Sequence, residues 1–186
     1  NTDDLPWAVW DEGVEAKMLR VSRETGTWVI INRFAPGKRI PTHHHDGAVH
    51  AYTLKGRWHY LEYDFVASPG SFEFEQAGST HTLEAMPDSE EPVEVFFVIE
   101  GGLILYDDDG NYFGYTDAQM ALDMYYGALD AAGIPRPTGS SNSRGSTHSG
   151  NSGGSASMKR FACWSMARRL RGTGPSGPRC SCRSFP

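Results

Sequence analysis

The chain has 186 residues, enough for one domain with a sizeable core, and a formal charge of −6 at pH 7. That charge is uneven. Residues 1–138 hold nine Lys and Arg beside all 23 Asp and Glu, a charge of −14, whereas residues 139–186 hold eight Lys and Arg and no acid, a charge of +8. An acidic first part argues against a nucleic-acid partner. The sequence also has no apolar run of 18 residues, which argues against a membrane span.

The composition predicts one domain over residues 1–138 and a separate tail over residues 139–186. The tail is rich in Ser, Gly and Arg, and it is predicted to be disordered. It is either a basic interaction segment or non-native sequence, such as an out-of-frame or vector-derived translation. All three cysteines lie in this tail, so we expect no disulfide framework in the domain. With no secretory signal visible, we expect a cytoplasmic protein.

Short strands and turns dominate residues 14–115. The expected strands are residues 27–34, 49–54, 58–63, 72–75, 93–99, 103–106 and 112–115. The glycine of Lys55-Gly56-Arg57 predicts a hairpin between residues 49–54 and 58–63, and Asp108-Asp109-Gly110-Asn111 predicts another between the last two strands. Residues 93–99 are the most apolar and should be central. Many short strands at close spacing predict an all-β fold, an antiparallel sandwich or barrel.

One helix is expected near the end of the domain, over about residues 116–133. Thr116 or Asp117 can cap it, and Gly133 is a stop signal. Met120, Met124 and Ala128 lie at four-residue spacing, so we expect this stripe to pack on the sheet.

Three histidines have the spacing of a metal site. His43 and His45 follow Gly37 as G-x5-H-x-H, and His81 ends a G-x7-G-x2-H segment that begins at Gly70. Alternate residues of a strand point to one face, so His43 and His45 can converge while His44 points away. Neutral imidazole suits Fe, Zn, Cu and Ni, and three imidazoles leave coordination positions open for a ligand.

These two segments resemble the two motifs of the cupin superfamily, which implies a small cupin, an antiparallel β-sandwich or jelly-roll barrel. The matching positions are Gly37, His43, His45, Gly56, Gly70, Gly78 and His81. The usual glutamate of the first motif is Val49 or His50 here, and the proline and asparagine of the second are Gln76 and Ala85. Without that glutamate the site becomes a three-histidine site, with His50 as a candidate fourth group.

The stretch from His43 to Leu83 is similar to the 2,4'-dihydroxyacetophenone dioxygenase family. The similarity rests on Gly-Arg-Trp-His-Tyr-Leu-Glu-Tyr-Asp at 56–64, Gly-Ser-Thr-His-Thr-Leu at 78–83, and the Asp4-Leu5-Pro6-Trp7 opening, and it covers roughly residues 3–138. It implies an Fe(II) enzyme that uses O2 to split a small aromatic hydroxyketone into 4-hydroxybenzoate and formate. It also implies a homo-oligomer, a dimer or a tetramer.

The chemistry needs a proton acceptor and a slot for a phenol ring. Glu75 is the first candidate base and His50 the second, although either could instead orient a ligand histidine. Glu73 shares the face of Glu75 by alternation. Aromatic residues could line the slot, with Trp58 and Tyr60 favoured because they alternate onto one face. The candidate pocket residues are Tyr52, Trp58, Tyr60 and Phe74.

Two other classes of function stay open. One is another three-histidine cupin enzyme, such as a diketone-cleaving dioxygenase. A metal-dependent isomerase fits less well, because such enzymes usually have a carboxylate ligand and the usual one is missing here. The second is a non-catalytic zinc-binding cupin of the anti-sigma type. Such cupins normally follow a helical domain, and this sequence opens close to its first strand, so we expect the enzyme. Imidazole ligands alone do not fix the metal.

Overall fold

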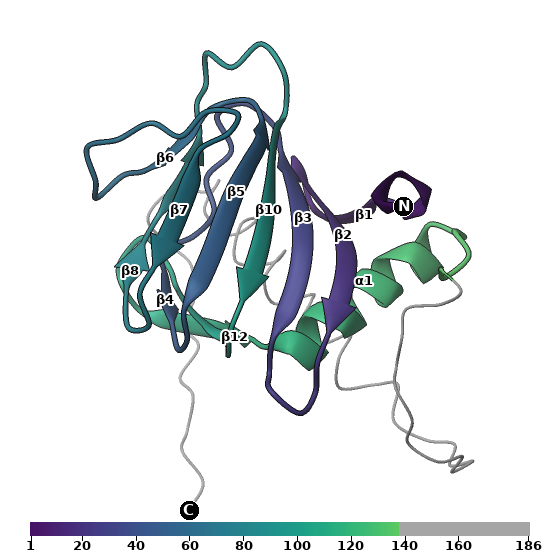
Figure 1. The fold of residues 1–186 in the computed structure, drawn as a ribbon. Helices are drawn as coiled ribbons and strands as arrows, with labels where there is room; N and C mark the ends of the chain where they lie inside the picture. Colours follow the sequence, from purple (N-terminus) through teal and green to yellow (C-terminus); the bar gives the residue numbers. More distant parts are fainter. Residues whose placement is uncertain (138–186) are drawn as a thin grey trace, which may run out of the picture. The chain divides into compact units, whose positions relative to one another are not determined.

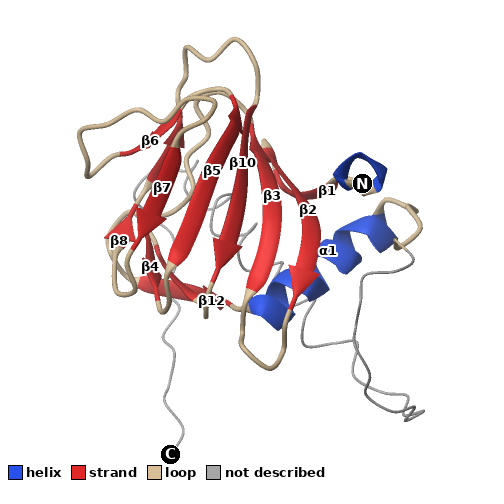
Figure 2. Ribbon diagram, in the orientation of Figure 1, coloured by secondary structure: helices blue, strands red, loops and turns tan. Residues whose placement is uncertain are grey.

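The structure, a computed structural model, describes residues 1–137. The predicted tail and the predicted boundary at residue 138 lie outside the described residues. Within residues 1–137, antiparallel strands form three sheets, and one α-helix follows them (Figures 1 and 2). The all-β prediction with a single terminal α-helix is therefore confirmed.

The largest sheet has six strands in the order β1-β2-β3-β10-β5-β7. In that order their bounds are Ala8–Asp11, Val14–Val21, Trp28–Phe34, Val93–Ile99, Val49–Lys55 and Phe72–Glu75. A four-stranded sheet runs β12-β11-β4-β8, with bounds Tyr112–Thr116, Leu103–Tyr106, His43–His45 and Thr80–His81. Strands β6 (Trp58–Tyr60) and β9 (Leu83–Ala85) pair separately. A short 3-10 helix, η1, covers Thr2–Asp4.

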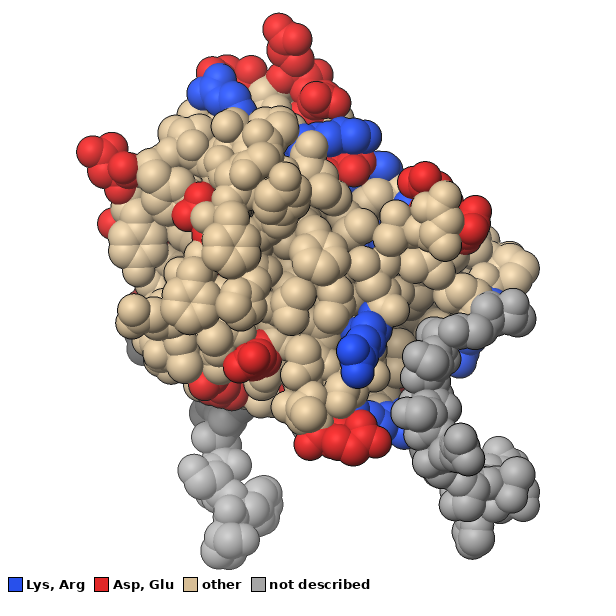
Figure 3. All heavy atoms as spheres, in the orientation of Figure 1, with Lys and Arg blue, Asp and Glu red and all other residues tan. Residues whose placement is uncertain are grey.

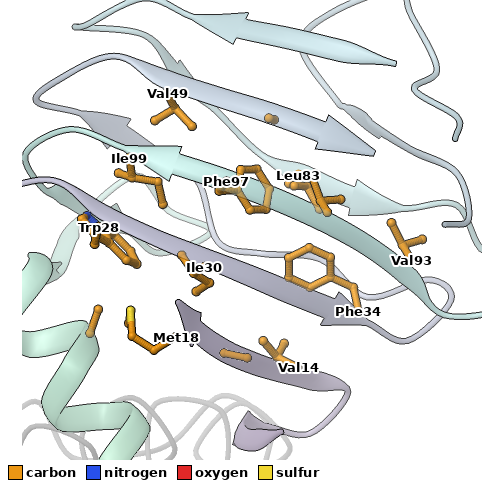
Figure 4. Close-up of a cluster of buried hydrophobic side chains, with 14 of the residues drawn as sticks. Val14, Met18, Trp28, Ile30, Phe34, Val49, Leu83, Val93, Phe97 and Ile99 are labelled. Atoms are coloured by element: carbon orange, nitrogen blue, oxygen red, sulfur yellow. The ribbon is translucent and has the colours of Figure 1, made fainter. Parts of the chain in front are cut away.

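The core lies on the inner face of the six-stranded sheet. Alternation along β10 buries Val93, Val95, Phe97 and Ile99, and the same alternation on β3 buries residues that include Trp28 and Ile30. Figure 4 shows Val93, Phe97 and Ile99 of β10 and Trp28 and Ile30 of β3 together with Leu83 from β9. Strand β10 lies between β3 and β5, so the prediction of a central strand at residues 93–99 is confirmed.

The predicted hairpin between residues 49–54 and 58–63 is wrong. Strand β5 pairs with β10 and β7, whereas β6 pairs with β9. Gly56 takes a φ of +69°, and a Cβ there would lie 2.9 Å from Val93 Cα. A positive φ and a close backbone approach mark this glycine as a corner between two sheets rather than a hairpin turn.

The second predicted hairpin is confirmed, since β11 pairs with β12 across residues 107–111. The predicted helix is α1, Ala118–Ala131, and the Asp117 side chain caps it by accepting a hydrogen bond from the Met120 N–H at 2.8 Å. The predicted stripe is rotated, however: the buried residues of α1 are Ala118, Ala121, Tyr125 and Leu129. Among the described residues, no helix has the length and apolarity to cross a membrane.

Candidate metal centre

The structure brings the three predicted histidines together. Strand β4 supplies His43 and His45, and it pairs with β8 so that His43 lies opposite His81. All three side chains are buried, and one ring nitrogen from each lies within 4.8 Å of the other two. His44 faces the other side of β4, where its Nδ1 lies 2.8 Å from Thr80 Oγ1. The convergence follows from the two-residue period of a strand, as the spacing predicted.

The environment keeps His43 neutral and oriented. Burial lowers the pKa of His43 to about 3, and the neighbouring His45 and His81 contribute to this lowering. Its Nδ1 lies 2.8 Å from the carbonyl oxygen of Pro41, so Nδ1–H can donate there and leave the Nε2 lone pair free. A neutral imidazole with its second nitrogen held in this way is the form that binds a metal.

Glu75 reaches the same point from the edge strand β7. Its carboxylate is buried, and Oε2 lies 2.9 Å from His45 Nε2 and 3.3 Å from His81 Nε2. The other oxygen, Oε1, accepts a short hydrogen bond from the Tyr60 hydroxyl. Burial raises the pKa of Glu75, but the approach of His45, His81 and Tyr60 outweighs burial and holds that pKa well below its usual range. The carboxyl group is therefore ionised at neutral pH.

These atoms fit a bound divalent metal. His45 Nε2 and His81 Nε2 lie 2.9 Å apart, and Glu75 Oε2 lies against both. Lone pairs crowded this closely repel unless a cation lies among them, and Oε2 has no well-formed hydrogen bond of its own. Two nitrogens at that separation suit neighbouring ligands of one ion at about 2.0–2.1 Å. His43, His45 and His81 would hold the metal, with Glu75 beside it.

Of the four predicted pocket aromatics, Tyr60 lies directly at the centre. Its ring stacks on His81, with centroids 3.7 Å apart. Burial, together with the Glu75 carboxylate, raises the pKa of Tyr60 well above its usual value, so its hydroxyl stays a donor. Trp58 packs edge-on against Tyr60 at 5.0 Å, and its Nε1–H donates to Thr53 Oγ1 at 2.8 Å. Trp58 is fully buried, so it supports Tyr60 from within the core.

The structure does not bring His50, Tyr52 or Phe74 to the centre. In the sheet register, His50 lies opposite Phe74 and Tyr52 lies opposite Phe72. All four side chains point out of the sheet, and Tyr52 and Phe74 are 44 % and 55 % exposed. The physical reason is alternation: Glu75 faces inward, so its neighbour Phe74 must face outward. The predicted second base and half of the predicted pocket therefore lie on the wrong face for that role.

The loop after β6 supplies side chains that the sequence pattern did not single out. The Tyr63 ring lies 6.2 Å from the His81 ring, and Phe65 packs edge-on against Tyr60 at 5.9 Å. The loop is tied to the strand of His81, because Glu62 Oε2 accepts a hydrogen bond from the Thr82 N–H at 2.8 Å. The run of aromatic residues after Trp58 pointed to these side chains. A loop has no regular sequence period, however, so the sequence could not predict which of them point inward.

Comparison with known families gives a match over most of the described residues. The family described as the ChrR cupin-like domain matches residues 1–109. No curated protein matches the chain.

Solved structures share the fold. An RmlC-like cupin from Ralstonia eutropha JMP134 has 28 % sequence identity and a TM-score of 0.68, over 74 % of this chain and 89 % of that one. A second protein with a cupin-like fold from the same organism has 27 % identity and a TM-score of 0.65, over 75 % and 91 %. An acetylacetone dioxygenase from Acinetobacter johnsonii has 22 % identity and a TM-score of 0.57, over 63 % and 80 %. The cupin fold predicted from the two motifs is confirmed.

Proposed function

The chain belongs to the family of ChrR cupin-like domains, and we propose that it is a mononuclear non-haem Fe(II) dioxygenase that cleaves a small aromatic 2-hydroxyketone. The substrate we propose is 2,4'-dihydroxyacetophenone. The observation that carries the proposal is the arrangement of Glu75: one carboxylate oxygen lies against the ligand histidines, and the other is fixed by Tyr60. A carboxylate held in this way can take part in proton transfer next to a metal.

The proposed reaction breaks the bond between the carbonyl carbon and the hydroxymethyl carbon. One O2 is consumed for each 4-hydroxybenzoate and formate, and both oxygen atoms end in the products, so no further oxidant or reductant is needed. When bound, Fe(II) would supply positive charge that favours a deprotonated hydroxyketone, and it would supply electrons to O2. Three neutral histidines suit this task because the ligands themselves add no negative charge to the ion.

Glu75 is the proton acceptor in this proposal. It is ionised at neutral pH, and Oε2 lies against His45 Nε2 and His81 Nε2, beside the position that a metal held by the histidines would take. Tyr60 donates to Oε1 and so fixes the direction of the carboxylate. The acidity of the substrate would come from the bound metal, which favours the deprotonated hydroxyketone.

Aromatic side chains beside the histidines suit a phenol ring. Tyr60 is stacked on His81, Tyr63 contacts both of these rings edge-on, and Phe65 lies against Tyr60. Tyr63 is 48 % exposed, so it lies where solvent meets the buried centre. We propose that Tyr63 and Phe65 take the place in the pocket that the sequence had suggested for Tyr52 and Phe74. Offset or edge-on contacts between such rings stabilise binding by about 0.5–1.5 kcal/mol each.

The fold neighbour from Acinetobacter johnsonii supports the reaction class only indirectly. Its name records an acetylacetone dioxygenase, and at 22 % identity the likeness extends to the fold. We take it as support for placing O2 chemistry on this scaffold, while the substrate rests on the residues above and on the resemblance of residues 56–64 and 78–83.

A zinc-binding, non-catalytic module is the second candidate. The matching family is named for ChrR, and Glu75 could act as a fourth ligand beside the three histidines. Four protein ligands close a tetrahedral site, as in structural zinc sites, whereas a catalytic site keeps a position open. The two candidates therefore assign Glu75 different roles.

Oxygen uptake by the Fe(II)-loaded full chain tests the proposal. With 2,4'-dihydroxyacetophenone, we expect equal amounts of O2 consumed, 4-hydroxybenzoate formed and formate formed. Zinc-loaded protein is the matched control and should consume no O2, because Zn²⁺ has no redox chemistry. Iron bound at one per chain without O2 uptake would overturn the dioxygenase proposal.

A further inference from the structure

The ring nitrogens that face away from the metal position differ in how they are held. A ligand imidazole almost always donates its second N–H to an oxygen, and this contact fixes the ring and its tautomer. His43 follows this rule, because its Nδ1 lies 2.8 Å from the Pro41 carbonyl oxygen. In His45, Nε2 lies against Glu75 Oε2, so a bound metal would take Nε2 and leave the proton on Nδ1. That Nδ1 is buried and has no hydrogen-bond partner among the described residues.

A serine hydroxyl in the same condition lies across the strand pair from His45. Strand β4 pairs with β8 so that His44 lies opposite Thr80. The register continues by one pair, where the His45 N–H donates to the Ser79 carbonyl oxygen at 3.0 Å. Ser79 Oγ is buried and, like His45 Nδ1, has no hydrogen-bond partner within residues 1–137. Each of these atoms is costly to leave unpaired, so their occurrence on facing residues indicates that they serve each other.

Alternation places the two side chains on one face. Thr80 faces outward, since its Oγ1 lies 2.8 Å from His44 Nδ1, so the preceding Ser79 faces inward with His45. Directly opposed residues of an antiparallel pair have Cβ atoms about 4.5–5.5 Å apart. Nδ1 is the ring nitrogen nearer to Cβ, so rotation about χ1 of Ser79 can bring Oγ within reach of a hydrogen bond.

The other groups around His45 are committed elsewhere. Glu75 holds Oε2 against the Nε2 atoms of His45 and His81, and its Oε1 accepts from the Tyr60 hydroxyl. His81 Nδ1 also lacks a partner within the described part of the chain, but Tyr60 stacks on that ring at 3.7 Å and so holds it. Figure 3 shows the surface over β5 and β7 largely free of charged side chains. A neutral acceptor from the paired strand, Ser79 Oγ, therefore suits His45 Nδ1.

We propose that Ser79 is a positioning residue for the metal: its hydroxyl accepts a hydrogen bond from His45 Nδ1–H and keeps Nε2 directed at the ion. Ser79 touches neither the metal nor the substrate and acts through His45. The inference rests on the three-histidine site of the proposed function, but not on iron or on the hydroxyketone. It holds equally if the site binds zinc.

The zinc affinity of the full chain, measured by competition with a chromogenic chelator, tests the inference. Ser79→Ala should bind zinc about 10–100-fold more weakly than wild type, because the His45 ring loses the group that orients it. Ser79→Thr keeps a hydroxyl and should restore most of that affinity. The matched control is Thr80→Ala, which removes a hydroxyl from the next residue on the outer face and should change the affinity by less than about twofold.

The proton on His45 Nδ1 gives a second readout, which a loss of packing alone would not move. In isotope-labelled, zinc-loaded wild type, NMR should place the His45 proton on Nδ1, close to the Ser79 methylene and slow to exchange with solvent. Exchange should be about tenfold faster in Ser79→Ala, because one hydrogen bond is lost. It should be unchanged in Thr80→Ala.

The wild-type spectrum decides the case in which Ser79→Ala misfolds. A His45 proton on Nε2, or one on Nδ1 with no contact to Ser79, would overturn the proposal, as would unchanged zinc affinity in a folded Ser79→Ala. A wild type that binds no zinc would overturn it together with the metal site. The expected Ser79 effects without O2 uptake by the iron form would support it and overturn the dioxygenase alone.

Discussion

An ordinary half-buried sheet is apolar on its inner face and polar on its outer face, whereas the β5–β7 pair carries polar side chains inside and aromatic side chains outside. The inner face buries Thr53 and Glu75, with Glu75 against His45 and His81, whereas the outer face exposes Tyr52, Phe72 and Phe74. Burying ionisable groups is costly unless they are paired or bind a metal, and exposing large aromatic side chains is unusual unless a partner covers them. Both departures indicate binding, because buried ionisable groups on the inner face suit a metal and exposed aromatic side chains on the outer face suit a partner. Because side chains alternate along a strand, neighbouring residues of β5 and β7 face opposite sides of the sheet and so meet different ligands.

Removing a proposed ligand should have the largest effect on the inner face. His81 is fully buried between Tyr60 and the other two histidines, so His81→Ala takes away one donor and leaves a cavity that no neighbour can fill with a nitrogen. We expect metal content to fall from one per chain to near zero and turnover to disappear. That loss exceeds the roughly 10–100-fold effect of changing an outer partner of a ligand. Elemental analysis and O2 uptake measure both.

The matched control for the ligand is His44→Ala. This residue lies between two proposed ligands in the sequence but faces the other side of β4, against Thr80. It should keep full metal content and turnover. Full iron stoichiometry in His81→Ala would contradict the metal site itself.

Changing the buried carboxylate should have the next largest effect. Glu75→Gln keeps the shape but cannot accept the proton, so we expect iron to stay bound while kcat falls by about 10²–10⁴-fold. Glu73→Gln is the control, because Glu73 is on the same strand and the same side but is only half-buried, and it should change kcat by less than about fivefold. If Glu75→Gln instead loses the metal, Glu75 is a ligand and the zinc-module candidate gains.

Lowering the pH should reduce the stability of the metal-free protein gradually, and this effect should be smaller than those of the two substitutions above. His43 has a pKa of about 3 when folded and an ordinary value of 6.5 when unfolded, so below pH 6.5 the unfolded chain binds a proton that the folded chain excludes. Stability is therefore full above pH 6.5 and falls as pH decreases toward 3, by about 1.4 kcal/mol per pH unit. Urea unfolding between neutral pH and about pH 5 measures this slope.

The histidine variants isolate that contribution. His43→Gln removes the group whose pKa is lowered, so its stability should depend less on pH than that of wild type over the same range. His44→Gln removes a histidine outside the cluster and should keep the wild-type slope. Equal slopes in all three proteins would show that the cluster does not exclude protons.

The sequence predicted the inner face better than the outer one for a physical reason. His43, His45 and His81 follow from strand alternation and from glycines that place the strands, and those signals are local. Gly56 misled because one glycine can open either a hairpin or a corner between sheets, and the choice depends on its contact with Val93, 37 residues later in the chain. The position of Tyr63 depends on how the loop after β6 lies beside His81, and no regular pattern in the sequence predicts that path.

The same alternation excludes two of the sequence candidates once the strand pairing is known. If Glu75 points inward, Phe74 cannot, and because β5 and β7 are paired, His50 opposite Phe74 must also point outward. That inference needs the pairing of β5 with β7. The incorrect hairpin of residues 49–54 with 58–63 had hidden it.

His50→Asn should have the smallest effect on iron content and turnover, because His50 lies on the outer face of the sheet. The ring of His50 stacks on Phe72 and lies tilted against Phe74 on the outer side, away from the three histidines. We expect iron content and kcat to stay within about twofold of wild type, since surface substitutions far from a site change little. A large loss of turnover would mean that β5 presents His50 inward when substrate binds, and the outward position of His50 would then not hold in the working enzyme.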